Sequence, residues 1–284
     1  MSNFCPICKG SALVDYRTVN NYNSLQCLGC NHIFVVDVHA LAFDKLYSED
    51  FYHNYMSGLG YDQAYKKYLV HDFKRKVSLI KKNFDTHIQI LEVGSGPGYF
   101  ADLMIKEGYK IIACELTEGA QKYAYQHGIN VRILNEDISK NCSISGMKFD
   151  LIVSWAVVEH IVNPQEYIQL LKSYLKPSGA LMLDTGIIDP IILKLDKGYT
   201  SWLFPPLHLH VFSSKSLPLL LTNLGFEVKR FWPKWNREPI LDLIKLYLRL
   251  FILKYFKKSK SPYDAPGVIG YIGLIYAKCN GLQS

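Results

Sequence analysis

The feature that most constrains this chain is the stretch at residues 88–100, which has the sequence IQILEVGSGPGYF. The alternating apolar residues at its start indicate a buried parallel strand. Gly94, Gly96 and Gly98 then turn the chain, and a helical pattern follows. Because glycine has no Cβ and adopts positive φ readily, such a turn lets the backbone approach a ligand closely. The stretch therefore predicts a strand, a turn and a helix, with a ligand bound at the turn.

The spacing of these glycines narrows the choice of ligand. A dinucleotide fingerprint has the form G-x-G-x-x-G, whereas this turn has G-x-G-x-G, and it lacks the Gly-Lys-Ser/Thr of a phosphate-binding P-loop. Glu92 stands two residues before the first glycine. The acidic-x-G-x-G-x-G pattern resembles motif I of class I S-adenosylmethionine-dependent methyltransferases.

Two acidic residues downstream fit this resemblance. Residues 110–116 predict a second strand that reaches Glu115, and a carboxylate at the end of a strand is placed to accept both hydroxyls of a ribose. Residues 131–134 predict a short third strand, followed by Asp137. In the family, an acidic side chain after the third strand holds the adenine amino group, so the resemblance assigns that role to Asp137.

The next segments continue the same order. Residues 149–154 predict a fourth strand, and the WAVVEH run at 155–160 resembles the segment beside the methyl donor in ubiquinone-type and sugar-type small-molecule methyltransferases. A helix at 164–175, an L-K-P-x-G turn and a strand at 180–184 follow. The alternative is a series of ordinary βα units, but the acids at two strand ends favour a ligand site.

The resemblance implies an α/β fold, a Rossmann-like seven-stranded class I methyltransferase core, with S-adenosylmethionine as cofactor and S-adenosylhomocysteine as product. The sixth and seventh strands, at 225–232 and 267–277, are expected to form an antiparallel edge hairpin. The predicted cofactor-binding residues are Glu92, Gly94, Gly96, Gly98, Glu115, Leu116, Asp137, Ile138 and Trp155.

Four cysteines near the N-terminus form a second strong pattern. Cys5, Cys8, Cys27 and Cys30 have the spacing C-x2-C-x18-C-x2-C, typical of two zinc knuckles that supply four thiolates to one Zn²⁺. Disulfides are disfavoured without a secretory signal, and redox chemistry is disfavoured outside a βαβ context. We expect a closed, structural zinc site in a ribbon, with His32 at the surface of that ribbon.

The organisation along the chain follows from these patterns. We predict a zinc ribbon at 1–38, a Tyr-rich helical cap or linker at 39–85, and a methyltransferase core at 86–284 with an apolar, basic helical insertion at about 234–262. In the cap, Tyr52 and Tyr61 are candidates to line the donor pocket, or the aromatic residues pack the ribbon onto the core. The polar start of the chain predicts a cytoplasmic protein.

Histidines are the candidate catalytic residues, because methyl transfer to oxygen or nitrogen needs a group that takes the acceptor's proton. His208 and His210 alternate, so an extended chain would point both to one side. His160, after the fourth strand, is the third candidate. We favour the first two, because they lie outside the donor-binding core, although each histidine has a structural role as its alternative.

The segment at 240–258 is apolar over most of its predicted helical surface, and its longest uninterrupted apolar run is too short to span a membrane. Three roles are open for this segment. It could pack on the core or on a partner in a homodimer, contact a membrane peripherally, or cover the substrate.

The chain resembles the zinc-ribbon methyltransferases that modify sugar nucleotides, polysaccharides and natural products. This resemblance implies the class of methyl acceptor. The sugar C-methyltransferases of this group carry a further large C-terminal domain that is absent here, so we expect O-methylation of a sugar or sugar-nucleotide or polysaccharide precursor. One alternative is a zinc-ribbon RNA methyltransferase, which the basic stretch at 66–82 favours. Another is a non-catalytic interaction module, which the intact acids and glycines disfavour.

Overall fold

The structure is a computed structural model that describes residues 3–36, 38, 63–117, 119–188, 203–231 and 271–279. The cap tyrosines Tyr52 and Tyr61 and the apolar segment at 240–258 lie outside the described residues. The described elements alternate between strands and helices over the core. In chain order they are β1 (Leu13–Val19), β2 (Tyr22–Cys27), β3 (Ile33–Val35), α3 (Gln63–Asn83), β4 (Gln89–Val93), α4 (Tyr99–Lys106), β5 (Lys110–Cys114), α5 (Gly119–Gln126), β6 (Ile133–Leu134), β7 (Phe149–Trp155), α6 (Pro164–Ser173), β8 (Leu175–Ile188), β9 (His210–Ser213), α8 (Ser216–Asn223), β10 (Phe226–Phe231) and β11 (Tyr271–Cys279).

Seven strands form the core of the sheet in the order β6-β5-β4-β7-β8-β11-β10. The first five are parallel, and β11 is antiparallel to both β8 and β10. The predicted edge hairpin of the sixth and seventh strands is therefore confirmed, with β11 placed between β8 and β10. Because β4 to β7 are parallel, the turns that follow them meet at one edge of the sheet. This is the edge where the predicted ligand residues lie.

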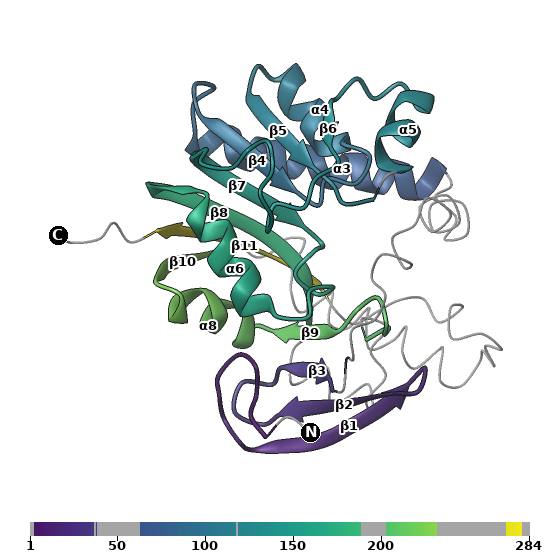
Figure 1. Cartoon of the computed structure of the whole chain (residues 1–284), viewed down its shortest axis with the longest axis vertical. Coiled ribbons are helices and arrows are strands. Elements are labelled where there is room, and N and C mark those ends of the chain that lie inside the picture. Colours follow the sequence, from purple (N-terminus) through teal and green to yellow (C-terminus); the bar gives the residue numbers. More distant parts are fainter. Residues whose placement is uncertain are drawn as a thin grey trace, which may run out of the picture.

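Helices cover both faces of the sheet, because the strand side chains alternate between two apolar clusters (Figure 1). On β4, Ile90 packs with residues of α3 and α4, whereas Leu91 packs with residues of α6 and α8. Near-continuous burial along β7 follows from this double cover. The parallel strands therefore hold their carboxyl ends in fixed positions.

The cysteine ribbon is continuous with the core sheet (Figure 1). Strand β3 of the ribbon pairs antiparallel with β9, with Phe34 opposite His210, and β9 pairs parallel with the end of β8. The described strands thus form one 11-stranded sheet, with the ribbon at its edge. The segment that carries the predicted acceptor histidines is held between the ribbon and the core.

One predicted turn differs from the structure. The L-K-P-x-G segment is the irregular start of β8: Phe149 of β7 pairs with Leu175, and Leu151 pairs with Ala180. Gly179 is needed there, because a Cβ atom would lie 3.0 Å from the backbone oxygens of both Lys176 and Phe149. The close approach of backbone to backbone keeps this segment in the strand.

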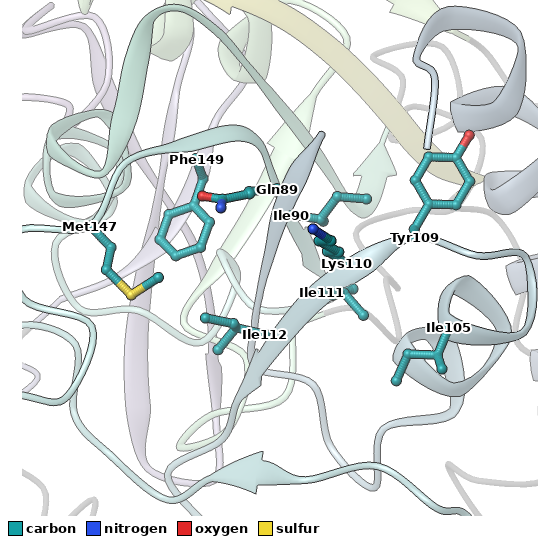
Figure 2. A pocket seen from close by; sticks show the side chains of 9 residues that line it. All are labelled: Gln89, Ile90, Ile105, Tyr109, Lys110, Ile111, Ile112, Met147 and Phe149. Carbon is teal, nitrogen blue, oxygen red and sulfur yellow. The ribbon is translucent and has the colours of Figure 1, made fainter. Parts of the chain in front are cut away.

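A pocket of about 390 Å³ opens at the amino edge of the sheet (Figure 2). Its lining includes Gln89, Lys110 and Phe149, the first residues of β4, β5 and β7. It lies at the opposite ends of these strands from the glycine turn, so it is separate from the predicted donor site. Among the described residues, no helix is long and apolar enough to cross a membrane.

Candidate functional site

The glycine turn is a tight loop between β4 and α4. Gly94, Gly96 and Gly98 all have positive φ, at 72°, 52° and 77°. The amides of Gly94 and Ser95 both donate to the carbonyl of Cys114, at 2.9 and 3.0 Å, which ties the loop to the end of β5. A Cβ atom on Gly94 would lie 2.4 Å from Cγ2 of Val157, so the loop also touches the segment after β7.

Glu115 follows β5 and faces this loop. Its Oε2 accepts a hydrogen bond from the amide of Gly96 at 2.9 Å, and its Oε1 accepts from the amide and the hydroxyl of Thr117, both at 3.1 Å. The next residue, Leu116, leaves 61% of its surface exposed although it is large and apolar. An anchored carboxylate beside an exposed apolar side chain suits a ligand with a hydroxylated ring and a flat base.

Glu92 lies beneath the glycine loop and is only 1% exposed. Burial raises the pKa of Glu92 well above its usual range, against the opposing influence of the Lys76 charge. Among the described residues, its Oε2 has no hydrogen-bond partner. Glu92 is therefore a buried carboxyl group near the end of β4, just before the loop.

Asp137 follows β6 in a turn that its own side chain stabilises. Oδ1 accepts from the amide and the hydroxyl of Ser139, at 2.9 and 2.6 Å. Partial burial acts to raise its pKa, but these hydrogen bonds and Lys140 lower the pKa below its usual value, so the carboxylate stays ionised. Ile138 is buried, and its carbonyl accepts from the hydroxyl of Tyr174 at 2.9 Å.

Trp155 at the end of β7 is buried, with 6% of its surface exposed. Its ring lies 5.2 Å from that of Phe100, and Nζ of Lys76 lies 4.5 Å from the indole ring. Lys76 is itself buried and forms ion pairs with Asp184, at 2.5 Å, and with Asp72, at 2.8 Å. Burial alone would lower the pKa of Lys76, but these two carboxylates raise it.

This buried ion pair was not predictable from the sequence, because Lys76 belongs to a basic run that favours a solvated face. Asp184 lies at the C-terminal part of β8, and its Oδ1 also accepts from the amide of Ala156 at 2.9 Å. The pair therefore fixes the start of the segment that leads from β7 to His160.

Two of the three candidate histidines come together. The rings of His160 and His208 are 4.7 Å apart, and the ligand atoms of these histidines and of Glu159 all lie within 4.8 Å of one another. Glu159 is 2% exposed, and burial raises its pKa to about 7. The sequence motif includes Glu159 in its E-H run but does not indicate a role for it. The adjacent acid and histidine were the available signal.

His210 lies outside this cluster and contacts the ribbon instead. His208 precedes β9, whereas His210 begins it and stacks on His32 of the ribbon. His32 is completely buried, which corrects its predicted place at the ribbon surface. The pairing of β3 with β9 closes the ribbon over both rings. Burial lowers the pKa of His210 to about 4, which keeps the ring neutral.

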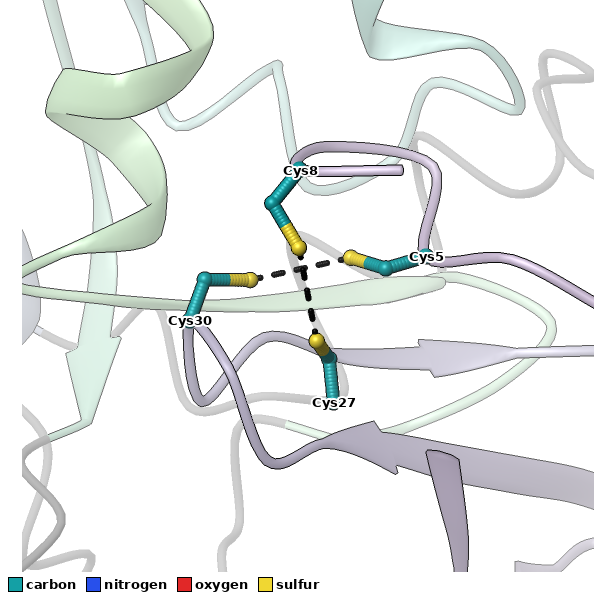
Figure 3. Close-up of side chains that lie close together, drawn as sticks. All are labelled: Cys5, Cys8, Cys27 and Cys30. Carbon is teal, nitrogen blue, oxygen red and sulfur yellow. Dashed lines mark hydrogen bonds between the residues drawn. The ribbon is translucent and has the colours of Figure 1, made fainter. Parts of the chain in front are cut away.

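The four ribbon cysteines converge as predicted (Figure 3). Sγ of Cys5 lies 3.6 Å from Sγ of Cys30, Sγ of Cys8 lies 3.5 Å from Sγ of Cys27, and all four sulfurs lie within 4.8 Å of one another. A tetrahedral Zn²⁺ with Zn–S bonds of about 2.3 Å separates its sulfurs by about 3.8 Å, so the cluster fits the ion.

Backbone amides support this assignment. Those of Ile7 and Gly10 donate to Sγ of Cys5 and Cys8, both at 3.4 Å, which favours thiolates. The four thiolates leave no open position on a tetrahedral ion, so a zinc here is structural.

Comparison with known proteins identifies the family. A family model described as a methyltransferase domain matches residues 65–230, more than half of the 284-residue chain. The chain therefore belongs to this methyltransferase family, which confirms the class predicted from the sequence motifs.

Individual relatives are more distant. The ubiquinone biosynthesis O-methyltransferase of Rickettsia canadensis is 26% identical over 157 residues, which are 50% of this chain and 64% of the relative. The enzyme of the same name from Rickettsia conorii is 25% identical over 177 residues, 57% of this chain and 59% of the relative. The chain thus spans less than two thirds of the length of these curated relatives.

Solved structures share the fold. The plantazolicin methyltransferase BpumL, in complex with a substrate analogue and S-adenosylhomocysteine, has a TM-score of 0.53 at 15% identity, over 84% of this chain and 92% of that chain. The 1,6-didemethyltoxoflavin-N1-methyltransferase of Burkholderia thailandensis has a TM-score of 0.52 at 13% identity, over 93% of this chain and 99% of that chain. These likenesses confirm the class I methyltransferase architecture.

Proposed function

We propose that this chain transfers the methyl group of S-adenosylmethionine to a hydroxyl oxygen of a small molecule, a sugar or a sugar-nucleotide or polysaccharide precursor. One observation carries the proposal: the glycine loop follows β4, and Glu159 and His160 of the cluster follow the neighbouring parallel strand β7, at the same edge of the sheet. Val157, two residues before Glu159, is in the position that a side chain on Gly94 would need. A donor in the loop would therefore lie beside the cluster.

The residues of the donor side have separate tasks in this proposal. The three glycines let the loop backbone approach the methionine part, Glu115 accepts the ribose hydroxyls, and Asp137 accepts from the adenine amino group. Leu116, exposed beside Glu115, packs on the adenine. The bound donor supplies a methyl group that its sulfonium already activates, so the protein mainly aligns the acceptor and removes its proton.

The cluster after β7 handles the acceptor. Nδ1 of His160 lies 2.9 Å from the carbonyl of Leu207, which fixes the proton on Nδ1 and leaves Nε2 as the acceptor atom. Burial lowers the pKa of His160, so the ring is neutral near pH 7. His208 lies against this ring, with the ring centroids 4.7 Å apart, and His210 joins the segment to His32 of the ribbon. A small acceptor is also consistent with the names of the relatives.

An RNA acceptor has less support. The basic run on α3 loses Lys76 to the buried ion pairs, and Lys81 pairs with Glu107. A steep fall of RNA binding with salt would favour this alternative.

The proposal is tested with methyl-labelled S-adenosylmethionine and an extract of the source cells. Label in a small species that phosphodiesterase degrades supports the nucleotide-sugar acceptor, whereas label in a nuclease-sensitive polymer contradicts it in favour of RNA. Gly94→Ala is the donor-defective control, because its Cβ would meet Val157 at 2.4 Å. Gly128→Ala is its match, since Gly128 also has positive φ but has nothing within 4 Å. Absence of label with wild type and Gly128→Ala, together with absence of S-adenosylhomocysteine binding, would favour an interaction module.

A further inference from the structure

We propose that Glu159, His160 and His208 bind a divalent transition-metal ion, a second metal site distinct from the cysteine ribbon. Their ligand atoms, one carboxylate oxygen and two imidazole nitrogens, lie within 4.8 Å of one another. Two histidines with one carboxylate are a set that suits Zn²⁺, Fe²⁺, Co²⁺ and Mn²⁺, and three protein ligands leave coordination positions open.

The carboxylate is the first independent support. Glu159 is 2% exposed, and within the described part of the chain its Oε2 has no hydrogen-bond partner. A buried, unpaired carboxylate oxygen is costly, and a cation beside it removes that cost. The side chain is therefore suited to an ion between it and the two histidines.

The orientation of His160 is the second support. Its Nδ1 donates to the carbonyl of Leu207 at 2.9 Å, so in the neutral ring Nε2 carries the lone pair that a metal ion needs. Metal-bound histidines commonly donate their other ring N–H to a backbone carbonyl in this way, because the bond fixes the ring and its tautomer. The sequence alone gives no access to this detail.

The backbone holds the two halves of the cluster together. The carbonyl of Glu159 accepts from the amides of Leu209 and His210, at 2.9 and 3.2 Å. Glu159 and His160 follow β7, whereas His208 precedes β9, and these bonds join the two segments without any ion. The ligands are therefore positioned by the fold before a metal binds.

A metal here deepens the proposed function, and its catalytic role rests on that function. The acceptor hydroxyl would bind to an open position, where the cation would lower its pKa; its proton would then leave to solvent and not to His160, which would be a metal ligand. The resulting alkoxide forms a C–O bond with the donor methyl group, while the C–S bond breaks and its electron pair stays on sulfur. The products are the methyl ether, neutral S-adenosylhomocysteine and one proton. Metal binding itself does not depend on this step.

The test measures Mn²⁺ binding to the full chain with zinc already in the ribbon. Mn²⁺ stands low in the affinity order of divalent metals, so it does not displace Zn²⁺ from four thiolates. Paramagnetic resonance counts free Mn²⁺ during a titration, and elemental analysis confirms that each sample retains its ribbon zinc. We expect one Mn²⁺ per wild-type chain, and binding weaker by at least about tenfold in His208→Gln and in Glu159→Gln.

His87→Gln is the matched control, because His87 is an exposed histidine just before β4, at the amino edge of the sheet. It should bind Mn²⁺ as wild type does. Failure of wild type to bind Mn²⁺ or Co²⁺, or unchanged binding in both cluster variants, overturns the metal site. Calorimetry with S-adenosylhomocysteine separates the two proposals. If the chain binds S-adenosylhomocysteine but not Mn²⁺, the methyltransferase proposal stands and the metal site is wrong. If the chain binds Mn²⁺ but not S-adenosylhomocysteine, only the metal site stands.

Discussion

His32 of the ribbon stacks on His210 of β9, with ring centroids 5.2 Å apart and with Nε2 and Nδ1 separated by 3.1 Å. This contact joins the metal-binding end of the chain to the segment that carries His208. Further bonds reinforce the junction: the hydroxyl of Ser213 donates to the carbonyl of Cys30 at 2.6 Å, and Nζ of Lys215 donates to that of Gly29 at 2.5 Å. The ribbon therefore supports the segment that carries His208, on the proposed acceptor side of the site.

Loss of the ribbon zinc should damage the acceptor side while sparing the donor side. Cys27→Ser removes one of the four thiolates, so we expect the chain to lose its zinc and its melting temperature to fall by at least about 5 °C. Binding of S-adenosylhomocysteine should persist, because the glycine loop and Glu115 are held by β4 and β5, but methyl transfer should be lost. Elemental analysis, thermal unfolding, calorimetry and transfer of the labelled methyl group check these four outcomes in turn.

Cys142→Ser is the control for this experiment, since Cys142 is a partly buried cysteine outside the ribbon. It should retain zinc and transfer. Loss of product binding together with the zinc would mean that the ribbon supports the whole core, and the proposed division between the two sides would be wrong.

Glu115→Gln should weaken donor binding while leaving the fold intact. The carboxylate accepts from the amides of Gly96 and Thr117, and an amide group would present N–H groups to one of these donors. Hydrogen bonds to a charged group contribute about 1.5–3 kcal/mol, so we expect affinity for S-adenosylhomocysteine to fall roughly 10- to 100-fold. Calorimetry measures this change. Glu166→Gln, an exposed glutamate on α6, should bind as wild type does, and equal affinities in both variants would remove Glu115 from the site.

The sequence predicts the core well because its signals are local. Alternating apolar residues, the glycine turn and the acids at strand ends each occupy a few consecutive residues, and the strand order follows from the family they resemble. The four cysteines are equally local, since two C-x2-C pairs specify their metal without the rest of the fold.

The arrangement of the histidines was not predictable in this way. Whether His208 meets Glu159 and whether His210 meets His32 depend on β9 pairing with both β8 and β3, which joins residues far apart in the chain. Alternation along residues 208–210 suggests a common side only for a regular strand, and β9 begins at His210. The ion pair of Lys76 with Asp184 is likewise a contact between distant segments.

Breaking the buried ion pair between Lys76 and Asp184 should destabilise the fold, whereas replacing both residues by neutral ones should have a small effect. Lys76→Met leaves Asp184, which is 2% exposed, as an unpaired buried carboxylate, so we expect unfolding free energy to fall by about 3–5 kcal/mol. The double variant Lys76→Met with Asp184→Asn removes that charge, while the new amide oxygen still accepts from Ala156. Urea unfolding should show that the double variant recovers most of the loss. A double variant as unstable as Lys76→Met would show that the cost lies in packing around Trp155, not in charge.

The burial of Glu92 predicts how the stability of the folded chain depends on pH. Its pKa is raised by burial in the folded chain, so between pH 4.5, where an unfolded glutamate loses its proton, and the higher folded pKa, the folded state holds the extra proton. Stability from this residue is therefore lost as pH rises above 4.5, by up to about 1.4 kcal/mol per pH unit. Glu92→Gln stays neutral at every pH and should gain stability over wild type as pH rises from 5 to 8, in urea unfolding without ligand. Glu166→Gln is the exposed control and should follow wild type. A constant difference between Glu92→Gln and wild type over this range would mean that Glu92 is ionised in the folded chain, paired with Lys76 instead of neutral beneath the loop.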